Sequence, residues 1–187
     1  METVTATSKL ETQDYLAETL VDRAKLCQGI GRLRESAADL SRALEVATRV
    51  REIARDDVRY RRTEARVRSQ LADIDVEFDS IDEAVAKIAQ GIAVFSELAD
   101  GQDVIPSDVP YLLLLMIQHG ELLRKLGRLE TSELVLEEAL QRARKREVSN
   151  KEPISRHLVA RILLESGRTL QAQEKDLDAA GKYIEEA

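Results

Sequence analysis

The chain repeats itself at a constant interval. Four segments of similar sequence begin at Gly31, Asp79, Gly127 and Lys175, and each start lies 48 residues after the one before. The segments read GRLRESAADLSRAL, DSIDEAVAKIAQGI, GRLETSELVLEEAL and KDLDAAGKYIEEA. A gapless period of this length is typical of one structural unit that is stacked on itself. The sequence therefore predicts an array of four like units.

Each unit carries apolar residues at the same positions. These positions lie five residues before, two after and nine after each start. The first two units hold Leu26, Leu33 and Leu40, then Ile74, Ile81 and Ile88; the last two hold Leu122, Leu129 and Leu136, then Leu170, Leu177 and Ile184. Apolar residues recur at helical spacing. Only three prolines interrupt a chain rich in Ala, Leu, Glu and Arg, so we expect an all-α fold.

Small residues occupy three other columns of the repeat. The columns lie seven residues before, five after and twelve after each start. Eleven of the twelve residues are Gly, Ala or Ser, and Arg168 is the exception. Small side chains let two helices approach closely, whereas larger ones force them apart. The columns therefore predict close packing between the two helices of each unit.

This order of small and large positions resembles the tetratricopeptide repeat (TPR) over roughly residues 17–187, best in the third unit with Gly120, Gly127 and Ser132. The family repeat has about 34 residues, so longer helices account for the 48 found here. The resemblance implies a right-handed superhelix of four antiparallel helical hairpins, all in one domain, 1–187. We expect units at 15–58, 59–108, 109–152 and 153–187, turns at 29–32, 77–80, 125–128 and 173–176, and a flexible segment at 1–14.

Residues with catalytic potential are few and scattered. His119 and His157 are the only histidines and Cys27 is the only cysteine, without the spacing of a zinc site. Gly29 and Gly31 fit a turn between helices better than a phosphate loop, since no GKS or GKT follows. We therefore expect no enzyme, no cofactor and no metal. The lone cysteine fits a reducing cytoplasm.

Charge excludes some partners. The net charge of −7 argues against duplex nucleic acid and against anionic membranes. No apolar run reaches the length of a membrane span. Two basic groups stand apart, one within 49–68 and one made of Arg142, Arg144, Lys145 and Arg146. They fit either ion pairing along the surface or a site for an anionic partner.

The resemblance also implies a binding face, because the first helix of each TPR hairpin lines the concave side of the array. We expect a peptide or helix of a partner protein to bind there, with Leu114, Ile117 and Ile162 forming an apolar patch. The matching positions are Arg66, Gln70, Asp73, Leu114, Ile117, Gln118, Glu121, Arg124, Ile162, Glu165 and Thr169. The alternative is a regulatory or sensor module of a larger bacterial signalling kinase or ATPase.

The last unit ends in the middle of its second helix. Residues 176–187 place Leu177, Ala180, Tyr183 and Ile184 at helical spacing, with no further unit to cover them. An apolar stripe at the end of a repeat array is unfavourable in water. We therefore expect a longer parent protein or self-association through this helix.

Overall fold

A computed structural model describes residues 2–150 and 153–173. Within these ranges the chain forms helices, turns and loops, without a strand. The helices are α1 (Glu2–Gly29), α2 (Leu33–Ile53), α3 (Val58–Glu77), α4 (Ile81–Asp100), α5 (Asp108–Lys125), α6 (Leu129–Asn150) and α7 (Pro153–Gln173). The all-α prediction is confirmed. None of the described helices is both long and apolar enough to cross a membrane.

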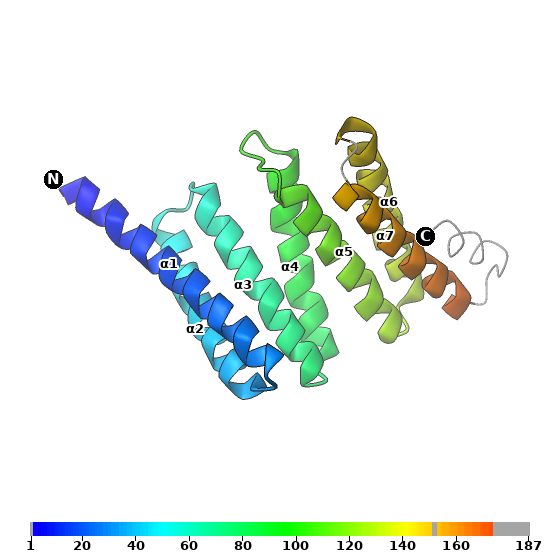
Figure 1. Cartoon of the computed structure of the whole chain (residues 1–187), viewed down its shortest axis with the longest axis horizontal. Coiled ribbons are helices and arrows are strands. Elements are labelled where there is room, and N and C mark those ends of the chain that lie inside the picture. The colour runs from blue at the N-terminus through cyan, green and yellow to red at the C-terminus, as the bar shows by residue number, and fades with distance from the viewer. Residues whose placement is uncertain (1, 151–152, 174–187) are drawn as a thin grey trace. The chain divides into compact units, whose positions relative to one another are not determined.

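Consecutive helices pair across short turns (Figure 1). Helix α1 packs against α2, and α5 packs against α6. An ion pair between Lys87 and Asp75 joins α4 to α3. The breaks between paired helices fall at 30–32, 78–80 and 126–128, as the repeat predicts. The fourth turn and the predicted helix 176–187 lie outside the described residues.

The three described turns share one backbone conformation. Gly31, Asp79 and Gly127 have φ values of 75°, 61° and 71°. Each is the first residue of its repeat segment. In each turn the next N–H closes a six-residue loop to a carbonyl of the helix, a common way to end a helix. The bonds run from Arg32 to Cys27 (2.8 Å), from Ser80 to Asp75 (2.7 Å) and from Arg128 to Leu123 (2.9 Å). The 48-residue period is therefore present in the backbone as well as in the sequence.

The chain divides into two compact halves, 1–94 and 95–187. We call them unit 1 and unit 2, as distinct from the four repeat units of the sequence. In unit 1, Leu20 and Ala24 of α1 meet Leu40 of α2 and Leu71 of α3 in one apolar core. The buried apolar residues of unit 2 come from the end of α4 and from α5, α6 and α7; among them are Phe95, Leu113, Met116, Ile117, Leu136, Ile162 and Leu163. The prediction that 1–187 form a single repeat domain stays a prediction.

The Gly, Ala and Ser residues of these columns are buried wherever the structure describes them. These residues are Ala24, Ala72, Gly120, Ser36, Ala84, Ser132, Ala43, Gly91 and Ala139. At Gly120 a Cβ atom would lie only 2.7 Å from the Leu136 side chain of α6. The exception in the sequence, Arg168, is exposed. Helix packing therefore explains these columns.

Two expectations differ from the structure. Helix α1 begins at Glu2, so residues 2–14 are helical where we expected a flexible segment. Leu26 is 72% exposed, although Ile74 and Leu122 in the same column are each 2% exposed. Ile74 belongs to the core that α3 shares with α1 and α2. No described hairpin precedes α1, so nothing described covers Leu26.

Candidate partner-binding site

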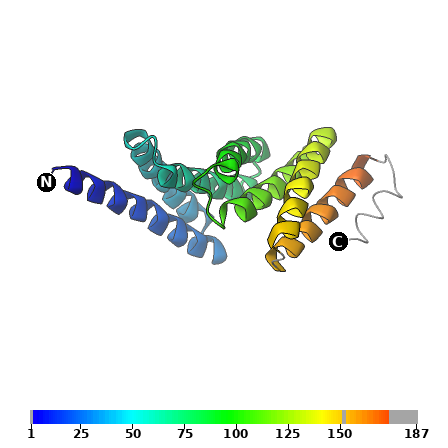
Figure 2. The same cartoon turned by 90° about the horizontal axis from the view of Figure 1, so that it is seen from above.

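The first helices of consecutive hairpins touch within each unit. Helix α3 packs against α1 in unit 1, and α7 packs against α5 in unit 2. Figure 2 shows these pairs from a second direction. We call the surface of α1 and α3 the unit 1 face and that of α5 and α7 the unit 2 face. They carry the eleven residues expected to bind a partner, three on the unit 1 face and eight on α5 and α7.

A shared carboxylate organises the unit 2 face. Glu165 of α7 accepts a hydrogen bond from Arg124 of α5 (3.1 Å) and another from Arg168 of α7 (2.6 Å). Only 9% of the Glu165 side chain is exposed, against 23% for Arg124 and 49% for Arg168. The carboxylate thus lies below two guanidinium groups that reach the surface. Such charge-assisted bonds fix the position of donors that a partner can use.

The α5 side of this face is also polar. Gln118 and Glu121 are half-buried, and Glu121 pairs with Lys125 at 3.0 Å. Leu114 is 38% exposed. Because positions 114, 118, 121 and 125 are three or four residues apart, they follow one stripe of the helix. The stripe offers one apolar side chain beside amide, acidic and basic groups.

Buried hydroxyl groups support the face from below. Ser132 of α6 donates to the Gly120 carbonyl of α5 (2.8 Å) and lies 3.1 Å from the Thr169 hydroxyl. Thr169 in turn bonds to the Glu165 carbonyl at 3.0 Å. These contacts link three helices through polar groups, which requires a specific register between them.

Three residues of the predicted site are buried. Ile117 is 1% exposed and Ile162 is 0% exposed, so neither contributes to an accessible apolar patch. Thr169, at 1%, is buried as well. Because α7 packs on both α5 and α6, these side chains are buried within unit 2. Only Leu114 of the three expected apolar side chains reaches the surface.

The unit 1 face is a mixture of charges. On α3, Arg66 is exposed, while Gln70 and Asp73 are half-buried and share a hydrogen bond of 3.4 Å. On α1, burial raises the pKa of Asp14 above its usual range, although a hydrogen bond with Thr63 lowers it. The hydrogen bond between Asp14 and Thr63 requires α1 and α3 to remain packed together. The face therefore presents fixed polar groups rather than an apolar groove.

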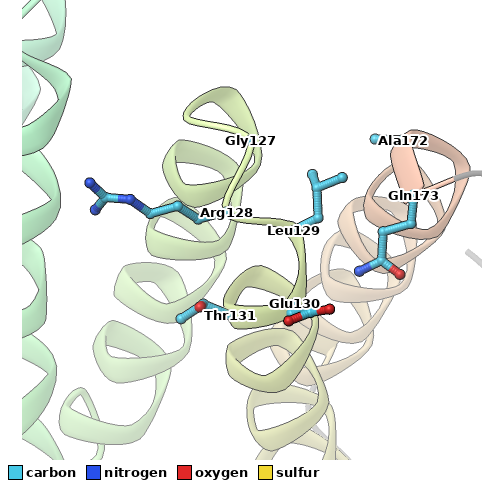
Figure 3. Close-up of a pocket in the computed structure, with 7 residues that line it drawn as sticks. All are labelled: Gly127, Arg128, Leu129, Glu130, Thr131, Ala172 and Gln173. Carbon is cyan, nitrogen blue, oxygen red and sulfur yellow. The ribbon is translucent and has the colours of Figure 1, made fainter.

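A pocket of about 450 Å³ opens in unit 2 between the start of α6 and the end of α7. Figure 3 shows Leu129 and Glu130 of α6 across from Gln173 of α7. The lining residues are Gly127, Arg128, Leu129, Glu130, Thr131, Ala172 and Gln173, without a histidine or cysteine among them. The pocket adjoins the last described residue, Gln173. Within the described chain no three His, Cys, Asp or Glu residues are grouped as metal ligands would be.

The basic groups of the sequence take part in ion pairs. Arg59 pairs with Asp57 at 2.7 Å, and Arg142 pairs with Glu138 at 3.0 Å and with Asp100 at 3.4 Å. Ion pairing along the surface therefore accounts for these two arginines. A feature that the sequence analysis missed is a second pocket, around Glu64. The sequence indicates this pocket through Glu64, a charged residue at a repeat position where the neighbouring repeats have Leu16 and Leu112.

Neither a family model nor a curated protein matches the sequence. Solved structures do match. BtubC (BKLC) from P. vanneervenii has a TM-score of 0.68 at 18% identity, over 98% of this chain and 69% of that one. Putative kinesin light chain TPR-like repeats from Podosopora anserina give 0.62 at 16%, over 96% and 73%. MamA gives 0.60 at 15%, over 96% and 81%. The chain is thus similar in fold to TPR-like repeat proteins, and the predicted fold class is confirmed.

Proposed function

We propose that the protein is a non-catalytic scaffold that binds a peptide or helix of a partner protein on its first-helix faces, in the cytoplasm. The TPR-like fold supports a scaffold in general, since repeat arrays present long surfaces made of successive helices. We assign the main contacts to the unit 2 face. Leu114, Gln118 and Glu121 would meet the partner from α5, and Arg124 and Arg168 would meet it beside Glu165.

One observation carries this proposal. Glu165 holds two guanidinium groups from different helices, and both are more exposed than the carboxylate that positions them. Arginines fixed in this way can donate to the carbonyl or carboxylate groups of a peptide with little further loss of side-chain entropy. Leu114 adds an exposed apolar side chain on the same helix as Arg124. The partner that fits best is an acidic amphipathic segment.

Site-specific photo-crosslinking tests the proposal. A photoreactive amino acid replaces Gln118 on the unit 2 face, and in a matched variant it replaces Glu137, which is exposed on α6. Each variant is irradiated in an extract of the organism that encodes the chain. We expect a specific protein adduct from position 118 and none from position 137. The crosslinked segment, made as a peptide, should bind the wild-type protein directly.

A second experiment tests how much Arg124 and Arg168 contribute to the affinity for this peptide. The variant with Arg124→Gln and Arg168→Gln should bind that peptide at least roughly tenfold more weakly, a difference of about 1.4 kcal/mol. Helical content by circular dichroism serves as the control for folding. Adducts that form from position 137 alone, or affinity that the double variant retains in full, would contradict the assignment of this face.

A further inference from the structure

A pocket of about 340 Å³ lies among α2, α3 and α4 in unit 1. Arg51 of α2, Glu64 and Arg68 of α3 and Gln90 of α4 are among its lining residues. We call it the arginine pocket. It involves the second helices α2 and α4, so it is a different surface from the unit 1 face of α1 and α3.

One buried carboxylate accepts hydrogen bonds from two arginines in this pocket. Glu64 accepts from Arg51 Nε at 2.9 Å through one oxygen and from Arg68 Nη2 at 2.7 Å through the other. Thr48 donates to it as well, at 3.0 Å. Burial raises the pKa of Glu64, but these three hydrogen bonds outweigh it, so the pKa lies below its usual range. Glu64 is therefore ionised at neutral pH.

The charges in the pocket are not balanced. The triad of Arg51, Glu64 and Arg68 contains two cations and one anion. Only 10% of the Glu64 side chain is exposed, against 36% for Arg51 and 30% for Arg68, so the cations lie nearer to solvent. Two guanidinium groups held at one carboxylate also repel each other. An additional anion would relieve this repulsion.

Donors remain for such an anion. Arg51 bonds to Glu64 through Nε, and no described residue accepts from its two terminal nitrogens. Arg68 uses Nη1 for Gln90, at 3.3 Å, and Nη2 for Glu64. A guanidinium group has five N–H donors in one plane, a geometry that suits a carboxylate. Ala65, Ala93 and Val94 supply an apolar wall.

The repeat shows that packing does not require this triad. One repeat period further along the chain, the positions of Arg51, Glu64 and Arg68 hold Ala99, Leu112 and Met116. Buried ion pairs often contribute no more stability than apolar residues of similar volume. An ionic cluster in place of apolar residues therefore points to recognition.

We propose that the arginine pocket binds an acidic side chain, Asp or Glu, from an extended segment of a partner protein. The carboxylate would bridge Arg51 and Arg68 while the adjoining chain packs on Ala93 and Val94. This second site works independently of the unit 2 face, so the two proposals stand or fall separately.

The probe is a fluorescein-labelled ten-residue peptide of alternating Glu and Gly, with a Gln–Gly peptide as control. The protein carries Arg51→Ala, Glu64→Leu and Arg68→Met together, which introduces the residues found 48 positions later in the chain. We expect the wild type to bind the Glu peptide at least roughly tenfold more tightly than the Gln peptide, and the triple variant to lose that preference. Arg34→Gln, at an exposed position of α2 outside the pocket, is the matched control and should bind like the wild type.

Nuclear magnetic resonance of the wild type gives a readout that needs no variant. Addition of the Glu peptide should shift the side-chain signals of Arg51, Arg68 and Gln90, and added salt should reverse the shifts. Four results would overturn the proposal: absence of Glu-peptide binding, equal binding of the Gln peptide, full binding by the triple variant, or shifts centred elsewhere. Tighter binding of a single-stranded oligonucleotide at equal salt would overturn it as well.

Discussion

Two serines at the same column of the repeat have different surroundings. Ser132 bonds to the Gly120 carbonyl, whereas the buried hydroxyl of Ser36 has no partner among the described residues. The second of the four sequence repeats has Ala84 at this position. A buried polar group without a partner costs stability, and a satisfied one contributes about 1 kcal/mol.

We therefore expect opposite effects from the same change. Ser132→Ala should lower the free energy of unfolding by about 1 kcal/mol, while Ser36→Ala should leave it unchanged or raise it. Urea unfolding of both variants beside the wild type measures this. Equal losses would show that the two hydroxyl groups are in similar environments.

Asp79 is a residue other than glycine in a left-handed turn. Its φ of 61° matches Gly31 and Gly127 at the same column, and an L-residue with a side chain is strained there. Asp79→Gly should raise the free energy of unfolding by about 0.5 kcal/mol, after the entropy that glycine adds to the unfolded chain. Gly127→Asp, the reverse change, should lower it by about 1 kcal/mol. A loss of stability in Asp79→Gly would be inconsistent with the shared turn.

His119 makes stability depend on pH. Burial lowers the pKa of this imidazole below its ordinary value of 6.5. The unfolded chain therefore takes up a proton at a higher pH than the folded chain does, so stability falls as the pH falls below about 6.5. His119→Gln should reduce the slope of unfolding free energy between pH 7 and roughly pH 5.5. Urea unfolding of the wild type and of this variant over that pH range measures the slope, and an unchanged slope would contradict the prediction.

At the scale of the elements, the small columns determine how closely helices pack. Ala84 and Ala139 are both 0% exposed, while Glu137 is exposed on the other side of α6. Ala84→Leu and Ala139→Leu should each cost about 1–3 kcal/mol of unfolding free energy because they overpack a contact. Glu137→Leu should cost much less. Urea unfolding that ranks the three variants equally would refute the assignment.

The elements also show what sequence alone could predict. The helix ends followed from Gly31, Asp79 and Gly127, because the pattern around each turn repeats locally. The exposure of Leu26 did not follow, since its column is apolar in every unit and only the absence of a described hairpin before α1 distinguishes it. Burial depends on neighbours that the local pattern does not contain.

The candidate site was predicted less well for the same reason. Alignment to the family pattern placed Arg124 and Glu165 on first helices, and the structure pairs them. It also placed Ile117 and Ile162 there, although tight packing of α7 on α5 buries both. Helical periodicity identifies a face but not how much of it the next helix covers. The arginine pocket did not follow from the repeat pattern, because Arg51, Glu64 and Arg68 depart from the residues found 48 positions later.

For the whole molecule, the repeat keeps one uniform register along the described chain. Within each unit, helices pack with the next helix or the next but one in the chain. In such arrays each unit depends mainly on its neighbours, so one pattern repeats along the chain. The register then places a left-handed residue every 48 positions, as at Gly31, Asp79 and Gly127.

Backbone chemical shifts of the isotope-labelled protein test this register. A uniform register predicts helical shifts over 33–53, 58–77, 81–100, 108–125 and 129–150. It also predicts isolated left-handed values at residues 31, 79 and 127. Helical shifts that continue without a break through Asp79 or Gly127, or extended strands anywhere in these segments, would contradict it.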